Sequence, residues 1–323
     1  MSSRHLIDPE LLAALEMFPP RGDMATLLPM IRDGLGALPT PDPETLPATI
    51  EERRIATREG HEIGIVILTP KGEARTRPAL LHIHGGGYVI GSAAMANATN
   101  AGRAAAADCV VVSVDYRLAP ETPHPGPLED CYAALAWLHD DADALRVDRA
   151  RIAIGGESAG GGLAAALALI ARDRGEIPLI HQHLIYSMID DRTCTAERHP
   201  YTGEFVWTPE QNRFGWSSLL GREPGGADVP HYAAAARAPD LAGLPPSFIA
   251  VGALDLFLEE DLEYARRLIR AGVPTELHVY PGAYHGFEVF SDAPVAKNAN
   301  ANSLAALKRA LHPDRTDAPG DRD

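Results

Sequence analysis

The chain has 323 residues, of which 46% are hydrophobic and 23% are charged, a composition typical of a globular protein with one large or two smaller domains. Its formal net charge of −15 at pH 7 repels phosphate backbones and anionic lipid, which argues against a nucleic-acid-binding function. No apolar stretch reaches transmembrane length, and acidic residues interrupt the N-terminal segment where a signal peptide would be apolar, so we expect a cytoplasmic protein without a membrane partner.

The first 45 residues differ in pattern from the rest of the chain. The stretch DPELLAALEMF offers Asp8 as an N-cap, Pro9 in the first turn and apolar residues at helical spacing. A proline-rich stretch, LPTPDPETLP, follows. Because this segment precedes every predicted strand, we expect it to form part of a lid or to cover a sheet face.

Apolar runs typical of strands then alternate with amphipathic stretches typical of helices. Strands are predicted over 62–70, 78–87, 109–117, 151–156, 177–188, 246–255 and 275–287, the last ending in a loop. Helices are predicted over 96–107, 127–142, 158–175, 258–272 and 295–312. Strands that are apolar throughout are buried on both faces, so the order indicates an α/β fold with a mostly parallel central sheet flanked by helices.

One stretch interrupts this alternation. Residues 188–221 contain no strand of the buried kind, hold two of the three tryptophans and are interpreted as a helical insertion above the sheet. We therefore expect a core of 46–187 and 222–312, a helical cap of 1–45 and 188–221, and a disordered polar tail of 313–323. The three cysteines, Cys109, Cys131 and Cys194, are too few and too widely spaced to predict a disulfide framework.

A serine lies in the tightest part of a predicted strand-to-helix turn. Gly156–Gly160 reads GESAG and fits the pattern G-x-S-x-G, in which a strained turn lifts one hydroxyl above the carboxyl edge of a sheet. A serine that only caps the helix is the alternative interpretation. A phosphate-binding loop is disfavoured because no Lys-Ser or Lys-Thr follows, and the glycine spacing of a dinucleotide site is absent.

A serine hydroxyl needs a base to become a nucleophile, and in this fold the acid and the histidine follow the serine along the chain. His285 lies in YPGAYHGF, just after the last predicted strand, and Asp255 ends the preceding one. Glu259, Glu260 and Asp261 compete with Asp255, but they are interpreted as acids that favour the dipole of the following helix. We predict a triad of Ser158, His285 and Asp255.

Negative charge that develops on a substrate oxygen needs fixed N–H donors. His84-Gly85-Gly86-Gly87 ends the strand before the serine unit, and three glycines allow the backbone N–H groups to approach one point. The amide of Ala159, at the helix start, is the natural further donor. Metal binding by His82 and His84, or by the HQH stretch at 181–183, is disfavoured because no further ligands lie near them, and no cofactor is expected.

These motifs together resemble the hormone-sensitive-lipase-like family of α/β-hydrolase esterases, in its bacterial form with a cap. The resemblance spans about 75–290 and rests on HGGGYVIGS, DYRLAPE, GESAGGGLA, LPPSFIAVGALD and YHGF, all in family order. It implies a carboxylesterase for short acyl or aryl esters, with Ser158 as nucleophile, His285 as base and then acid, and Asp255 orienting His285. It also implies oxyanion donors at Gly86, Gly87 and Ala159.

The resemblance has further implications and three departures. Arg117 and Glu121 of DYRLAPE are expected to hold the loop beneath the site. Glu157 stands where relatives usually have Asp or Thr, and Leu256 and Ser187 stand where Pro is usual. The role of Glu157 does not follow from the sequence. Candidate pocket walls are Tyr88, Phe205, Trp207, Phe214, Trp216 and Phe287, of which at most half are expected to face a ligand.

Other functions remain open at this stage. An amidase or acyltransferase would use the same triad, because the pocket walls select the leaving group or acceptor. A non-catalytic ligand receptor on the same fold is disfavoured by the presence of His285, and a long-chain lipase by the lack of a long exposed apolar segment. The expected partner is a small-molecule ester, and the predicted strand TELHVY is a candidate edge for a homodimer.

Overall fold

A single mixed sheet organises the protein. The computed structural model describes residues 2–18, 22–36 and 42–313. Within these residues, eight strands pair in the order β1-β2-β4-β3-β5-β6-β7-β8. The strands are β1 (Ala48–Ala56), β2 (Glu62–Pro70), β3 (Arg77–Ile83), β4 (Val110–Asp115), β5 (Val147–Glu157), β6 (His181–Ile185), β7 (Ser247–Gly252) and β8 (Thr275–Tyr280).

Most of the sheet is parallel, as the sequence predicts. Only the β1–β2 and β2–β4 pairs are antiparallel among the described strands, and all pairs from β4 through β3 to β8 are parallel. Loops that follow parallel strands emerge at one edge, so those after β3, β5, β7 and β8 meet at the carboxyl edge of the sheet. That edge is where α/β folds place their ligand sites.

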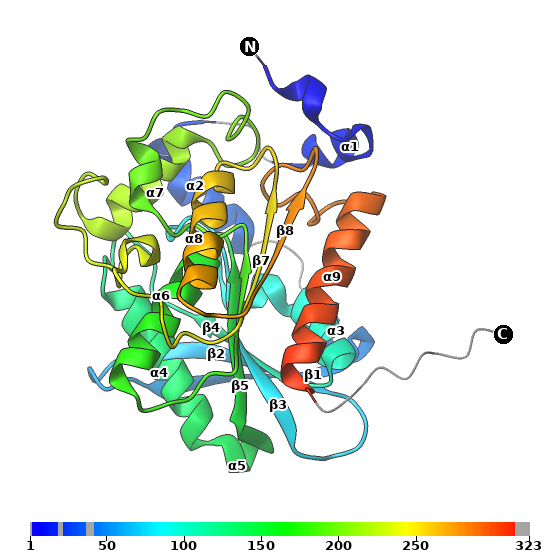
Figure 1. The fold of residues 1–323 in the computed structure, drawn as a ribbon. Coiled ribbons are helices and arrows are strands. Elements are labelled where there is room, and N and C mark those ends of the chain that lie inside the picture. Colours follow the sequence, from blue (N-terminus) through cyan, green and yellow to red (C-terminus); the bar gives the residue numbers. More distant parts are fainter. Residues whose placement is uncertain (1, 19–21, 37–41, 314–323) are drawn as a thin grey trace.

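Helices cover both faces of the sheet (Figure 1). The helices of the described residues are α1 (Leu12–Leu15), α2 (Met24–Gly36), α3 (Asn97–Ala107), α4 (Gly126–Asp140), α5 (Ala142–Leu145), α6 (Ala159–Arg174), α7 (Pro209–Leu220), α8 (Leu258–Arg270) and α9 (Pro294–Leu311). Helices α4, α6 and α8 lie on one face and α3 and α9 on the other, while α1, α2 and α7 lie toward the carboxyl edge.

The strand side chains explain why both faces are covered. Neighbouring residues of β3 point to opposite faces, so Leu81 joins the apolar cluster under α4 and α6, and Leu80 joins the one under α3. Both side chains are at most 1% exposed. Cys109 and Cys131 are buried and unpaired within these clusters, as expected for small apolar side chains.

The sequence prediction missed the first strand and placed some boundaries too far out. Strand β1 has the charged segment EERR in its centre, where Glu51 and Glu52 are both exposed, so it lacks the long apolar run of the other strands. The strand expected over 177–188 is regular only over β6, because the chain turns away after Ile185. The tail expected to be disordered lies, except for Pro313, outside the described residues.

Candidate active site

The turn between β5 and α6 holds Ser158 in a strained backbone conformation. Its φ of 57° lies in the left-handed region, which residues other than glycine rarely adopt. A Cβ atom on Gly156 would lie 2.3 Å from the carbonyl oxygen of Ile83, and one on Gly160 would lie 2.0 Å from it. Within the part of the chain that the structure describes, the serine side chain makes no capping bond to α6, which rules out the helix-cap interpretation.

Three side chains from three loops of the carboxyl edge form a hydrogen-bonded chain. The Oγ of Ser158 lies 3.0 Å from Nε2 of His285, and Nδ1 of the same ring lies 2.8 Å from Oδ2 of Asp255. All three residues are buried. The carboxylate accepts a hydrogen bond from the Nδ1–H group, which leaves Nε2 unprotonated and able to accept the serine proton. The arrangement is that of an activated nucleophile.

Aromatic rings hold the His285 imidazole on its sides. The ring of Tyr186 meets it edge-on at 4.7 Å, and the ring of Phe257 does so at 5.3 Å. The indole of Trp207 lies 6.5 Å away. Tyr186 and Phe257 are not among the residues predicted for the site. Tyr186 directly follows β6, and Phe257 lies in the loop between β7 and α8. This position at the carboxyl edge is the signal that could have identified them.

The glycine loop after β3 lies directly against the nucleophile turn. A Cβ atom on Gly85 would lie 2.9 Å from the carbonyl oxygen of Glu157 and 3.3 Å from Cβ of Ser158. Gly86 and Gly87 have φ values of 117° and 58°, backbone conformations that favour glycine. The structure therefore brings the predicted oxyanion glycines and the helix start at Ala159 to the same corner as the serine.

The histidines weighed above as metal ligands contact other groups of the protein. Nδ1 of His84 lies 2.7 Å from the carbonyl oxygen of Gly85, and its ring stacks on Tyr116 at 4.2 Å. Burial lowers the pKa of His84 to about 4, so the ring is neutral near pH 7. His181 and His183 contact each other on the face under α9, and burial lowers the pKa of both.

The structure separates the six aromatic candidates for pocket walls. Trp207 lies beside the catalytic groups, and a Cβ atom on Gly87 would overlap its indole at 2.1 Å. Tyr88 instead donates to the carbonyl oxygen of Met188 at 2.6 Å and packs against the fully buried Trp216. The other three pack into apolar clusters: Phe205 and Phe287 near the N-terminal segment and α9, and Phe214 against α2.

Two of the three departures from the family pattern have contacts that explain them. The backbone N–H of Ser187 donates to Oδ2 of Asp261 at 3.0 Å, a bond that a proline at this position could not make. Leu256 packs against Gly203, where a Cβ atom would lie 2.7 Å from a leucine methyl. Glu157, the third departure, lies in a polar cluster described below.

The acids at the start of α8 do more than favour the helix dipole. Glu260 and Asp261 are both buried, and burial raises the pKa of both carboxyl groups well above their usual range. Oε1 of Glu260 accepts from the N–H groups of Ile189 and Asp190 at 2.7 and 3.1 Å. They thus hold the segment after β6, which also bonds to the serine turn.

The residues expected to hold the loop beneath the site do so in two different ways. The guanidinium of Arg117 pairs with the buried carboxylate of Asp130 in α4, at 2.8 Å. Glu121 is exposed and pairs with Arg32 of α2 at 2.7 Å. Arg32 also donates to the carbonyl oxygens of Val89 and Ala119, each at 2.8 Å. One residue therefore ties the loop to the core, and the other ties it to the N-terminal helix.

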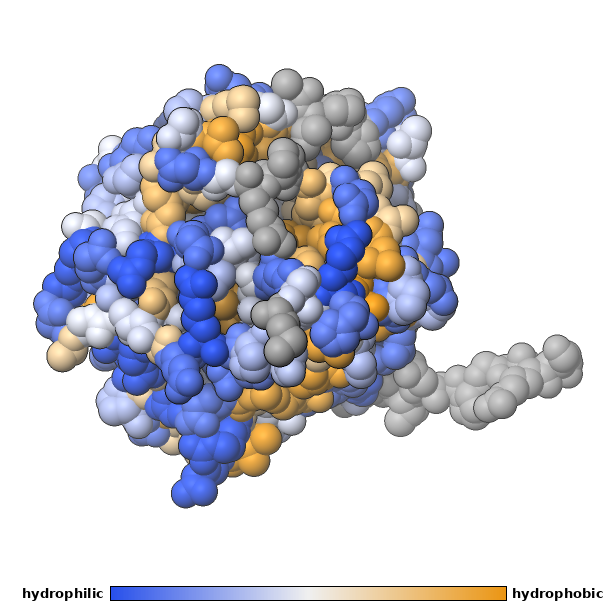
Figure 2. Space-filling view, turned by 90° about the horizontal axis from the view of Figure 1, so that it is seen from above, coloured by the Kyte–Doolittle hydropathy of each residue, from blue (hydrophilic) through white to orange (hydrophobic). Residues whose placement is uncertain are grey.

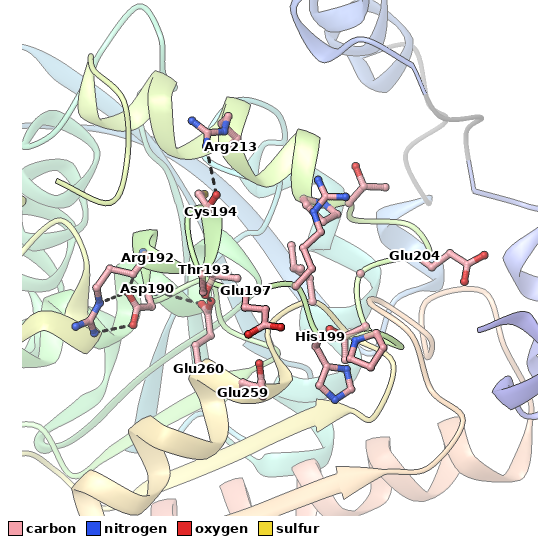
Figure 3. A pocket seen from close by; sticks show the side chains of 18 of the residues that line it. Asp190, Arg192, Thr193, Cys194, Glu197, His199, Glu204, Arg213, Glu259 and Glu260 are labelled. Carbon is pink, nitrogen blue, oxygen red and sulfur yellow. Dashed lines mark hydrogen bonds and ion pairs between the residues drawn. The ribbon is translucent and has the colours of Figure 1, made fainter. Parts of the chain in front are cut away.

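A surface hollow of about 840 Å³ lies beside the triad without including it (Figure 3). It is lined by the 192–204 segment and by the starts of α7 and α8. Leu256 and Thr208, which follow Asp255 and Trp207 in the chain, form part of its wall. In the close-up, Glu197 and Glu259 point toward this hollow.

Comparison with known proteins agrees with this geometry. A family model described as the alpha/beta hydrolase fold matches residues 80–289. The chain belongs to the hormone-sensitive-lipase-like family of α/β hydrolases. It is 37% identical over 314 residues to carboxylesterase NlhH of Mycobacterium tuberculosis, covering 95% of this chain and 97% of that one. It is also 32% identical to an arylesterase of Saccharolobus solfataricus over 71% and 74% of the two chains.

A solved structure shows the same relationship. A bacterial heroin esterase superposes with a TM-score of 0.88 at 38% identity, covering 98% of this chain and 100% of that one. This hydrolase-family protein is therefore a carboxylic-ester hydrolase with a Ser-His-Asp triad. In the described part of the chain, no helix has the length and apolarity needed to cross a bilayer.

Proposed function

We propose that this hydrolase cleaves short-chain acyl or aryl esters through an acyl-enzyme on Ser158. The observation that carries the proposal is the chain of bonds from Ser158 through His285 to Asp255. The names arylesterase and heroin esterase, carried by two similar proteins, support small and aryl ester substrates. The indole of Trp207 above Gly87 supports a short acyl site, because it fills the space beside the oxyanion loop.

In the first half of the reaction, Oγ of Ser158 forms a bond to the ester carbonyl carbon, and His285 takes the hydroxyl proton at Nε2. The carbonyl oxygen becomes an anion, which the N–H groups of Gly86, Gly87 and Ala159 stabilise. The C–O bond to the alcohol then breaks, and His285 returns its proton to the leaving oxygen. Asp255 keeps the imidazole in the tautomer that this exchange requires.

The second half reverses these roles with water. Nε2 of His285 takes a proton from water as the water oxygen bonds to the acyl carbon. The second oxyanion uses the same donors, and its collapse breaks the bond to Oγ of Ser158. The proton on His285 returns to the serine, and the carboxylic acid leaves. An amidase or acyltransferase would use the same steps with another leaving group or acceptor.

We also propose that 1–45 and 188–221 form a cap over the site, with 46–187 and 222–312 as the core. Arg32 of α2 donates to two carbonyl oxygens of the loop after β3 and the loop after β4, which supports this placement of α2. Phe214 of the 188–221 segment packs against α2, so the two parts of the proposed cap are in contact. Apolar patches lie among polar ones on the face seen from above, the side that carries α1 and α7 (Figure 2). Met17 and Met30 are 63% exposed and suit an ester-binding rim.

We also propose that two copies of the chain pair through β8 as a homodimer and that the protein is cytoplasmic. Strand β8 is the last strand in the sheet order, and its Val279 is 41% exposed, which supports pairing with a second copy. Cys109 and Cys131 are free thiols, as in a reducing compartment. Size-exclusion chromatography with light scattering tests the dimer, and fractionation of the source cell tests the location.

One substrate series tests the proposed activity. The p-nitrophenyl esters from acetate to palmitate, phenyl acetate and p-nitroacetanilide are hydrolysed in parallel. We expect kcat/KM to be highest at two to six acyl carbons, with the anilide far slower than the acetate ester. A maximum at palmitate, or an anilide rate equal to that of the ester, would contradict a short-chain esterase.

A further inference from the structure

Glu157, the residue directly before the nucleophile, lies in a polar cluster on the face of the sheet that α3 covers. Its Oε2 lies 2.7 Å from Nε2 of His82, and its Oε1 accepts from Arg103 at 2.9 Å. The side chain is 23% exposed, and that of His82 is 2% exposed. The carboxylate is thus held at both oxygens by groups from two other elements, β3 and α3.

The register of the sheet explains how these groups meet. His82 of β3 lies opposite Gly155 of β5, and Glu157 is two residues further along the same strand. Side chains two residues apart share a face, so Glu157 is the diagonal neighbour of His82. Helix α3 covers this face and supplies Arg103 from above (Figure 1).

Further bonds close the cluster into a ring. The amide Nδ2 of Asn100 lies 2.9 Å from Nδ1 of His82, and its Oδ1 accepts from Arg103 at 2.8 Å. Nδ1 of His82 also lies 3.0 Å from the hydroxyl of Ser113, so in the tautomer with the proton on Nε2 the ring accepts from Asn100 and donates to Glu157. Burial alone would raise the pKa of Glu157, but His82 and Arg103 outweigh it and hold this pKa well below its usual range.

The backbone of Glu157 touches the other half of the catalytic machinery. Its carbonyl oxygen would lie only 2.9 Å from a Cβ atom on Gly85, the residue that opens the oxyanion loop. The strand that carries this loop is the same β3 that carries His82, two residues before His84. The backbone contact between Glu157 and Gly85 and the side-chain contact between Glu157 and His82 both leave no spare room. A shift of Glu157 therefore moves Ser158 and the oxyanion loop relative to each other.

We propose that Glu157 is a positioning residue, clamped by His82 and Arg103, that sets the separation between Oγ of Ser158 and the oxyanion N–H groups of the loop after β3. It contacts no reacting atom. This role rests on the proposed function, because an oxyanion hole is useful only to an enzyme whose reaction forms an oxyanion intermediate. A displacement well below 1 Å at such a site is enough to lower the rate of the chemical step.

The test compares Glu157→Gln with a matched control in the same chain. Glu276 is also bonded to a histidine, His278, and to an arginine, Arg309, but its side chain is 39% exposed and it lies near the start of β8, away from the carboxyl edge that holds the serine. Glu276→Gln therefore removes a carboxylate from the same kind of cluster without touching the site. Arg103→Gln is the second test variant, because it removes one side of the clamp and leaves Glu157 in place.

The measurements are kcat and KM for p-nitrophenyl acetate, the melting temperature, and the affinity for an alkyl trifluoromethyl ketone. Such a ketone forms a bond from its carbonyl carbon to Oγ of Ser158, with the serine proton on His285 and the new oxyanion in the donor site. We expect Glu157→Gln to lower kcat about tenfold with KM changed less than twofold, and to weaken ketone binding by a similar factor. Arg103→Gln should lower both kcat and the affinity for the ketone, and Glu276→Gln should change neither of these quantities.

Unchanged kcat and ketone affinity in Glu157→Gln, even with a lower melting temperature, would overturn the proposal and leave a purely structural role. If that variant does not fold, the same outcome in Arg103→Gln overturns it. The failure of the proposed function itself gives a different result, since the unaltered protein would then neither turn over the ester nor bind the ketone.

Discussion

The Nδ1 atom of His285 lies 2.8 Å from Oδ2 of Asp255, and the other oxygen of this carboxylate accepts from the N–H of Phe257 at 2.9 Å. The carboxylate is only 1% exposed, so water does not compete for it. It thus fixes both the tautomer and the tilt of the imidazole. His285 can serve Ser158 only while this bond is present.

Replacing Asp255 with Asn therefore tests the orientation of the base. The asparagine has the same shape, but its amide donates where the carboxylate accepts, so His285 takes the wrong tautomer. We expect kcat to fall by about 10³- to 10⁴-fold with an unchanged circular dichroism spectrum. Asp240→Asn, at an exposed aspartate, should retain full activity. A loss of less than tenfold in Asp255→Asn would contradict the assigned role.

Trp207 provides the test of the acyl pocket. Its indole fills the space beside Gly87 and His285, so Trp207→Ala should admit longer acyl chains. We expect the ratio of kcat/KM for octanoate to that for acetate esters to rise at least about tenfold, because a single additional methylene group accommodated in the pocket is worth roughly 1–3 kcal/mol. Trp216→Phe should lower stability and leave this ratio unchanged, because that ring is fully buried against Tyr88. An unaltered ratio in Trp207→Ala would place the acyl chain elsewhere.

Arg32 tests whether α2 is fastened to the core as a cap. Arg32→Ala removes donors to two carbonyl oxygens and to Glu121, so we expect unfolding to become easier by about 1–3 kcal/mol. Limited proteolysis should cut within the first 45 residues sooner, and KM should rise. Arg4→Ala removes an exposed pair with Glu16 in the same segment and should change none of these. Equal proteolysis of both variants would contradict an anchoring role.

The burial of Glu260 predicts how the stability of the folded protein changes with pH. Burial raises its pKa well above the usual value, so the folded protein binds this proton more tightly than the unfolded chain does. The stability that this provides is complete below about pH 4, near the ordinary carboxyl pKa, and is lost as the pH rises toward the folded pKa. Glu260→Gln does not ionise and keeps an oxygen for the two N–H groups.

The measurement is the melting temperature of Glu260→Gln minus that of the unaltered protein, from pH 5 to pH 8. We expect this difference to become more positive as the pH rises. Glu263→Gln is the control, because Glu263 is exposed and Arg266 lowers its pKa instead. A difference for Glu260→Gln that is constant or falls with pH would show that Glu260 is ionised in the folded protein.

Much of the fold and the triad could be predicted from the sequence because strong local signals carried them. The buried strands are apolar throughout, and the order of serine, acid and histidine at successive strand ends brings Ser158, Asp255 and His285 to one edge. The signal failed for β1, whose charged centre interrupts its alternation. It also gave no way to choose among the aromatic residues, since only tertiary packing places Trp207 at the site and Trp216 in the core.

The polar residues near the site were harder to predict for a physical reason. An acid at a helix start suits the dipole whether or not it is buried, so Glu260 and Asp261 could not be recognised as anchors for the segment after β6. The role of Glu157 depends on partners 75 and 54 residues away, His82 and Arg103. Such contacts follow from the register of β3 and β5 and the placement of α3, which no local pattern specifies.

The most direct test of the whole account is the turnover of p-nitrophenyl acetate by Ser158→Ala, measured beside the unaltered protein at pH 7.5. The substitution removes only Oγ and leaves the turn, His285 and the glycine loop in place. We expect kcat to fall by at least about 10⁴-fold. Turnover within tenfold of the unaltered protein would show that Ser158 is not the nucleophile.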